Sequence, residues 1–238
     1  MADIVLLNNI DHADLRVAKG YGAAFGDAVN QTTAFPTEFE ALQREYPILF
    51  RRDPGAAPQA VVLLGLERDE NLFLDGDRWD ARYVPAAHRR GPFSIGVQSG
   101  RDGARDPCIN IDLASPRLGA EGEAVFKRHG GATPYLEGVQ DALSVIYEGL
   151  QTIGSIVETF EALGLIEPVA IDITVGEGLT YKLGDFHVVS RERLAALDGP
   201  ALERLNREGW LALAVHAAAS LGNIQTLIDR KNRKEGWA

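Results

Sequence analysis

Cysteine is almost absent from this sequence: Cys108 is the single one among 238 residues. One cysteine cannot form an intramolecular disulfide, so the fold does not depend on a disulfide framework. Cys108 lies in the apolar, strand-like run PCINIDL, where we expect a buried and unreactive thiol.

Positive charge and long apolar runs are also scarce. The chain has 24 Lys and Arg against 34 Asp and Glu, a net charge of -10, whereas binding to nucleic acid requires a basic surface. No segment approaches the roughly 18 uninterrupted apolar residues that cross a bilayer. The start, MADIVLLNNID, lacks the basic residues and the longer apolar stretch of a secretory signal. We therefore expect a cytoplasmic protein with no nucleic-acid partner and no membrane span.

Catalytic and nucleotide-binding signatures are missing as well. The sequence has no G-x-S-x-G elbow, no P-loop and no G-x-G-x-x-G motif, so we predict no cofactor and favour a noncatalytic protein, with enzymatic activity left open. The alternative is a metal-dependent enzyme or accessory of the cupin-like oxygenase type. His12 and Asp14 have the H-x-D spacing that supplies two legs of an iron-binding facial triad. In the structural interpretation, Asp11 or Asp14 closes a turn and His12 orients the loop.

The pattern of apolar residues predicts an α+β fold with a mixed β-sheet in the N-terminal half. Residues 1–117 read as the strand-rich part and 118–238 as the helix-rich part of one unit. The segment FPTEFEALQREYP predicts a helix, because Phe39, Leu42 and Tyr46 share a face and Pro36 suits a first turn. Short runs bounded by Gly, Pro, Asn and Asp predict strands at 4–7, 15–17, 48–50, 60–66, 71–74, 94–97 and 108–113.

The helix-rich part begins with Thr133 as a predicted N-cap and Pro134 in the first turn. Apolar residues then recur with a seven-residue repeat from Leu136 to Phe160. This stripe indicates either the seam of a homodimer or a helix that packs on its own sheet, continuous or broken near Gly149 and Gly154. EPVAIDITV and TYKLGDFHVVS predict a β-hairpin, and helices with a solvated basic tail follow.

The segment RYVPAAHRRGPF carries the strongest candidate binding site. A turn bounded by Pro85 and Pro92 presents His88, Arg89 and Arg90, and guanidinium groups bind carboxylates or phosphates in a planar, bidentate manner. The aromatic residues of the predicted site are Tyr83 and Phe93. We expect substitution of either arginine to weaken the binding of an anionic partner. In the competing interpretation, the arginines pair with internal carboxylates such as Glu38 or Glu45.

Several phrases together resemble the bacterial SapC family. They are LNNIDHADLRV, FPTEFEALQREYPILFRRD, LLGLERDENLFL, WDARYVPAAHRRGPF, LEGVQDAL, FEALGLIEP and LERLNREGWLALAVHAAASLGNIQTLIDRK. The family is named for association with a bacterial surface layer. Its members tend to be encoded near outer-membrane receptors, tryptophan halogenase-like proteins and cupin-like hydroxylases. The resemblance therefore implies an adaptor that recognises a peptide, a protein or a small anionic ligand, accessory to receptor or substrate-modification systems.

Overall fold

The computed structural model of the chain describes residues 2–52, 58–99, 105–176 and 178–237. It contains antiparallel sheets and helices, which confirms the predicted α+β class. The chain divides into two compact units, each assembled from three segments. Unit 1 comprises residues 1–27, 74–79 and 86–147, and unit 2 comprises residues 28–73, 80–85 and 148–238. Each unit thus draws on both the strand-rich and the helix-rich part.

Unit 2 is built on a five-stranded antiparallel sheet in the order β12-β13-β4-β5-β3. The strands are β3 (Gln31–Ala34), β4 (Ile48–Arg51), β5 (Gln59–Leu63), β12 (Ile166–Val175) and β13 (Leu179–Val189). The predicted hairpin is confirmed, since β12 and β13 pair along almost their whole length. Strand β3 was not predicted: its sequence, QTTA, is short and mostly polar.

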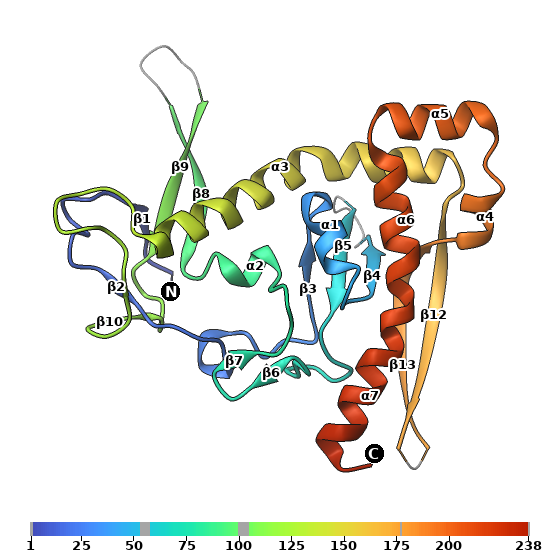
Figure 1. Cartoon of the computed structure of the whole chain (residues 1–238), viewed down its shortest axis with the longest axis horizontal. Coiled ribbons are helices and arrows are strands. Elements are labelled where there is room, and N and C mark those ends of the chain that lie inside the picture. Colours follow the sequence, from blue (N-terminus) through green and yellow to red (C-terminus); the bar gives the residue numbers. More distant parts are fainter. Residues whose placement is uncertain (1, 53–57, 100–104, 177, 238) are drawn as a thin grey trace. The chain divides into compact units, whose positions relative to one another are not determined.

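Helices pack on this sheet and include the predicted FPTEFEALQREYP segment. That segment begins with a 3-10 turn η2 (Pro36–Glu38) and continues as α1 (Phe39–Leu42), and its apolar residues Phe39, Leu42 and Tyr46 are fully buried. The C-terminal helices are α4 (Arg191–Ala195), α5 (Gly199–Arg207), α6 (Trp210–Ser220), η3 (Leu221–Asn223) and α7 (Ile224–Glu235). Helices α6 and α7 follow one another along β13 and β12 (Figure 1).

Unit 1 contains small sheets joined by loops. Its elements are β1 (Ile4–Leu6), β2 (Arg16–Val17), η1 (Ala23–Phe25), β6 (Leu74–Asp75), β7 (Arg78–Trp79), α2 (Ala86–Arg89), β8 (Phe93–Ser99), β9 (Arg105–Asp112), β10 (Leu118–Gly119) and β11 (Glu123–Ala124). Strand β9 lies between β1 and β8, while β2 lies between β10 and β11. Cys108, on β9, is half-buried, which is less than its apolar surroundings suggested. The strand predicted at 71–74 is wrong, since only Leu74 belongs to a strand.

The helix α3 (Pro134–Ala162) begins in unit 1 and ends in unit 2. Its start is the predicted one, since the Leu136 N–H donates to Thr133 Oγ1 at 3.3 Å. The helix continues through Gly149 and Gly154 without a break. Most of the seven-residue stripe is buried within the chain, namely Leu136, Val139, Leu143, Ile146, Val157 and Phe160. Leu150 differs, with 57% of its surface exposed.

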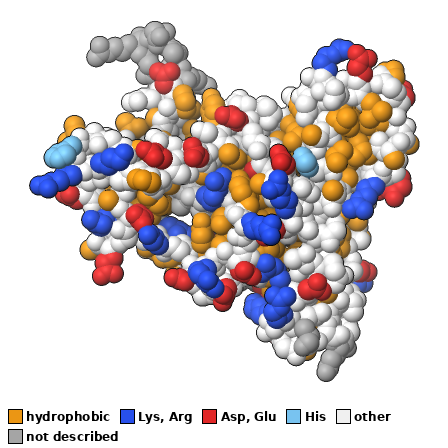
Figure 2. All heavy atoms as spheres, viewed as in Figure 1, with side chains coloured by type: hydrophobic (Ala, Val, Ile, Leu, Met, Phe, Trp, Pro, Cys, Tyr) orange, Lys and Arg blue, Asp and Glu red, His pale blue; other side chains and the backbone are white. Residues whose placement is uncertain are grey.

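Among the residues that the structure describes, one helical stretch is long and apolar enough to cross a membrane by length and composition alone. It covers Trp210–Glu235, with a mean hydropathy of 1.4 in its most apolar window, 28% of which is buried. The core helix of a soluble protein has the same properties, so a single stretch of this kind is weak evidence for a membrane span. Figure 2 shows hydrophobic side chains gathered where α5 and α6 lie, and Leu202 and Val215 are the exposed large ones on these helices.

Candidate functional site

The predicted turn that carries the His-Arg-Arg cluster is present as helix α2. The Arg90 N–H donates to the Ala86 carbonyl at 3.0 Å, and Gly91 then leaves the helix with a φ of 54°. A left-handed conformation of this kind favours glycine, and Pro92 cannot continue a helix. The segment is therefore a single, sharply ended turn.

His88 forms a buried pair with Asp27, a residue that the sequence analysis did not single out. The His88 Nδ1 and Asp27 Oδ1 atoms lie 2.8 Å apart, and the two side chains are only 8% and 4% exposed. Arg117 completes the cluster, since its Nη2 donates to Asp27 Oδ2 at 2.6 Å and its Nη1 to the Gly20 carbonyl at 2.7 Å. A carboxylate buried in unit 1 is thus held between a guanidinium group and an imidazole.

A cavity of about 430 Å³ lies beside this cluster. All of its lining residues belong to unit 1. They are Ala18, Lys19, Gly20, Tyr21, His88, Arg89, Gly91, Arg117, Glu123, Pro134 and Tyr135. The lining includes His88 and Arg89 of the predicted site, so the structure brings these two residues to one concave surface.

Cations and phenols dominate the polar groups of this wall. Lys19, Arg89 and Arg117 supply positive charge, and Glu123 forms an ion pair with Lys19 at the exposed edge. Burial raises the pKa of Tyr21 and raises the pKa of Tyr135 to about 12. Both phenols therefore stay protonated at neutral pH and keep an O–H group that can donate to an anion.

Arg90 and Phe93 lie elsewhere in unit 1. The described lining of the cavity includes neither residue. Arg90 Nη1 donates to the Phe93 carbonyl at 2.6 Å, and burial lowers the pKa of its guanidinium. The Phe93 side chain is fully buried, with its ring centroid 6.3 Å from that of Tyr135. These contacts support a structural role for both residues, which fix the start of β8.

Tyr83 belongs to unit 2, where it joins residues that the sequence analysis considered as internal partners for the arginines. Its hydroxyl donates to Glu38 Oε2 at 2.8 Å, and its backbone N–H donates to Glu45 Oε2 at 3.2 Å. The Tyr46 hydroxyl donates to its carbonyl at 2.6 Å. Tyr83 therefore ties the segment 80–85 to the α1 region of unit 2.

The alternative pair, His12 and Asp14, lies in a turn of unit 1. The His12 Nδ1 atom is 3.1 Å from the backbone nitrogen of Asn8, and Asn8 Oδ1 accepts from the N–H groups of Ile10 and Asp11. Asn8 thus closes the turn, and His12 braces it. Within the described residues, no three His, Cys, Asp or Glu side chains are grouped so that they could hold a metal ion.

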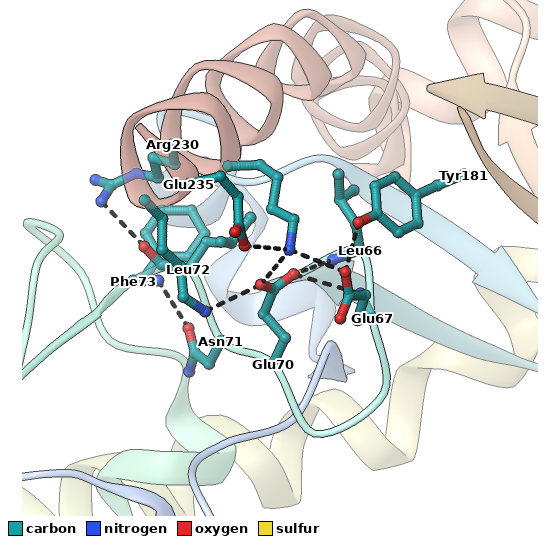
Figure 3. A network of polar contacts seen from close by, with 11 residues as sticks. Leu66, Glu67, Glu70, Asn71, Leu72, Phe73, Tyr181, Arg230 and Glu235 are labelled. Atoms are coloured by element: carbon teal, nitrogen blue, oxygen red, sulfur yellow. Dashed lines mark hydrogen bonds and ion pairs between the residues drawn. The ribbon is translucent and has the colours of Figure 1, made fainter. Parts of the chain in front are cut away.

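A second polar cluster lies in unit 2 and joins α7 to the loop after β5 (Figure 3). Lys231 Nζ donates to carboxylate oxygens of Glu67, Glu70 and Glu235, each at 3.0 Å, while the Tyr181 hydroxyl donates to Glu67. The Lys231 side chain is 3% exposed, so the expectation of a solvated basic tail is wrong at this position. All three N–H donors of the ammonium are satisfied, which indicates a structural role.

Sequence reasoning singled out His88 but missed Asp27, which pairs with it, and Arg117, which binds Asp27. Asp27 lies in an unremarkable loop, and 90 residues separate it from Arg117. Tyr21 and Tyr135, which line the cavity, are also far apart in the sequence, in the first and last segments of unit 1. A local pattern carries no signal for such pairs. The sequence is rich in arginine before residue 130, but this pattern does not predict which arginines line the cavity.

Comparisons with known proteins place the chain in a family. No curated protein and no solved structure matches it. The family model SapC matches residues 7–227, which is most of the chain and spans both units. The match includes every described residue that lines the cavity. The chain belongs to the SapC family.

Proposed function

We propose that the protein is a binding or adaptor protein whose unit 1 holds a small carboxylate-bearing ligand in the cavity beside α2. The observation that carries this proposal is the lining of the cavity, where Arg89, Arg117 and Lys19 meet the phenols of Tyr21 and Tyr135. Guanidinium groups and protonated phenols donate hydrogen bonds that are strongest toward an ionised acceptor.

The balance of charge in this region supports an anionic ligand. Arg117 is bound to Asp27, and Lys19 is paired with Glu123, so both cations are held in place within unit 1. Arg89 adds a third positive charge at the same wall, near enough to Tyr21 to lower the pKa of its phenol against the effect of burial. A carboxylate in the cavity would lie beside all three cations.

The shape and composition of the wall favour a ligand with an apolar body. Tyr21 and Tyr135 line the cavity with aromatic side chains, and Pro134 adds aliphatic surface. The Tyr21 ring is held edge-on by Trp79, with ring centroids 5.4 Å apart. Sites for small molecules combine such apolar walls with a few polar groups that fix orientation, and a rigid wall loses little entropy on binding. An aryl carboxylate, or a peptide end with an aromatic side chain, fits this description.

Titration calorimetry with phenylacetate as the probe tests the proposal. We expect phenylacetate to bind and phenylacetamide, which has the same shape but no charge, to bind at least about 10-fold more weakly, because a charge-assisted hydrogen bond contributes about 1.5–3 kcal/mol. Arg89→Ala should weaken phenylacetate binding by a similar factor. Arg78→Ala is the control, because Arg78 is an exposed arginine of unit 1 that is paired with Asp75.

Melting temperatures, measured beside the binding affinities, separate the residues that bind the ligand from those that stabilise the fold. We expect Arg90→Ala to lower the melting temperature, because Arg90 is bound to the Phe93 carbonyl. If phenylacetate and phenylacetamide bind alike, or if Arg89→Ala leaves the affinity for phenylacetate unchanged, the cavity does not recognise a carboxylate.

A further inference from the structure

The described lining of the cavity beside α2 contains a single acidic side chain, that of Glu123. Glu123 lies on β11, which pairs with β2, whereas Arg89 is the last residue of α2. Figure 1 shows β2 and α2 apart from each other within unit 1. The Glu123 side chain is 37% exposed, so its carboxylate is accessible to a bound molecule. A cation and an anion thus reach the cavity from different elements of unit 1.

The two phenols of the cavity lie near different charges. Burial raises the pKa of Tyr21, and the nearby guanidinium of Arg89 lowers it. Burial raises the pKa of Tyr135 to about 12, and the nearby carboxylate of Glu123 adds to this increase. Arg117 lowers the pKa of both phenols, so its guanidinium acts on both parts of the wall. The part of the wall at Tyr21 is therefore cationic, while a carboxylate lies near the part at Tyr135.

The ion pair between Glu123 and Lys19 leaves this carboxylate able to bind a further group. Lys19 Nζ contacts Oε1, and the two oxygens of a carboxylate together accept several hydrogen bonds. The Lys19 side chain is 75% exposed, and ion pairs this open to water contribute little free energy. Glu123 can therefore accept from a cationic group of a ligand, beside Lys19 or in its place.

We propose that the ligand is a zwitterion, whose ammonium group binds Glu123 while its carboxylate lies beside Arg89. This inference rests on the proposed function and adds the acid of the wall to it as a second recognition element. A carboxylate alone meets Glu123 as a like charge, whereas a molecule with both charges is matched at both. The ligand class is thereby narrowed from carboxylates in general to aromatic amino acids and short peptides with free termini.

Two sources share this chemistry. A free amino acid carries its ammonium group on the carbon next to the carboxylate, and a dipeptide carries it one residue further away. Phenylalanine represents the first source and glycylphenylalanine the second. Replacement of the ammonium group by hydrogen turns phenylalanine into 3-phenylpropionate and glycylphenylalanine into N-acetylphenylalanine. Each zwitterion therefore has a matched anion as its reference.

Titration calorimetry with the intact protein at neutral pH compares each zwitterion with its reference. We expect at least one zwitterion to bind about 3- to 5-fold more tightly than its matched anion, the range that one partly exposed ion pair supplies. The larger of the two preferences identifies the source of the ligand: a free amino acid if it lies in the phenylalanine pair, and a peptide if it lies in the glycylphenylalanine pair.

A variant and its control assign the preference to Glu123. Glu123→Gln keeps the size of the side chain and removes its charge, so the preference for the zwitterion should be lost. The readout is the ratio of affinities within a pair, because release of Lys19 from its ion pair strengthens the binding of both members alike. Glu121→Gln is the control, since Glu121 is an exposed acid of the same segment outside the described lining, and the preference should persist in it. Near-ultraviolet circular dichroism, which reports on Tyr21 and Tyr135, checks that both variants keep the native packing.

The outcomes separate this inference from the proposed function. If both anions bind in an Arg89-dependent manner and neither zwitterion binds more tightly, the cavity recognises carboxylates and this inference alone is wrong. If the preference persists in Glu123→Gln, or is lost equally in Glu121→Gln, Glu123 does not bind the ammonium group and the inference is also wrong. If none of the four probes binds, the proposed function and this inference fall together.

Discussion

Lys231 Nζ lies 3.0 Å from Glu70 Oε1, and only 3% and 6% of these two side chains are exposed. This ion pair joins the last helix, α7, to the loop that follows β5, with Lys234 as a second donor to the same oxygen at 3.0 Å. Removal of one member of a buried pair leaves an uncompensated charge. The network therefore decides how firmly the C-terminal helix is held in unit 2.

We expect Lys231→Ala to lower the free energy of unfolding by about 3 kcal/mol, because Glu70 loses its buried ammonium partner and Glu67 and Glu235 are left to repel each other. Lys234→Ala is the control. The Lys234 side chain is 53% exposed, so its removal should cost about 1 kcal/mol or less. Urea denaturation measures both values, and equal losses would show that Lys231 has no special weight in the network.

The pH dependence of stability should report on Glu70. Desolvation raises the pKa of this carboxyl, but hydrogen bonds from Lys231 and Lys234 outweigh it, so the pKa is lowered overall. A lowered folded-state pKa means that the unfolded state binds more protons in acid. The stabilisation is present above the ordinary glutamate value of about 4.3 and is lost as the pH falls below it.

We expect the difference in unfolding free energy between the wild type and Glu70→Gln to be constant from pH 7 to pH 5 and to shrink below about pH 4.3. Denaturation curves at pH 7, 5 and 3.5 test this expectation. A difference that stays unchanged at pH 3.5 would show that the Glu70 carboxylate is not stabilised by its lysine partners.

Two glycines inside α3 should respond in opposite ways to the same substitution. A Cβ on Gly149 would lie 2.6 Å from the Phe35 Cβ, whereas a Cβ on Gly154 would meet no heavy atom within 4 Å. Gly154→Ala should stabilise the protein by up to about 1 kcal/mol, through helix propensity alone. Gly149→Ala should destabilise it, because the contact with Phe35 outweighs the same gain. Melting temperatures decide the point, and stabilisation by both variants would contradict the close packing of α3 on Phe35.

A homodimer remains a prediction from the seven-residue stripe. Most of the stripe is buried within the chain, while Leu150 and Tyr147 are 57% and 38% exposed on α3. We expect light scattering to give twice the monomer mass of 25.8 kDa at micromolar concentration. Leu150→Glu should shift the mass toward the monomer. If the wild type has the mass of a monomer, the dimer prediction is wrong and the stripe serves packing within the chain.

Sequence patterns predicted the features that depend on interactions between residues close together in the chain. The cap at Thr133, the buried face of α1 and the β12–β13 hairpin follow from capping, helical spacing and alternation, which act over a few residues. Lys231 was misjudged because a basic last turn normally faces water, and its buried partner Glu70 lies 161 residues away. Asp27 and Arg117 escaped notice for the same reason, since burial of a charge depends on tertiary contacts that spacing does not encode.

The alternation of the two units along the chain also bears on how this protein can be divided. The backbone passes between the units after residues 27, 73, 79, 85 and 147, so neither unit corresponds to one continuous stretch of coding sequence. A chain divided at one point between residues 28 and 147 gives two fragments, each of which contains parts of both units. No single fragment therefore carries one complete unit from one gene to another. A gene that encodes the complete cavity-bearing unit therefore also encodes the segments of unit 2 that lie between its parts.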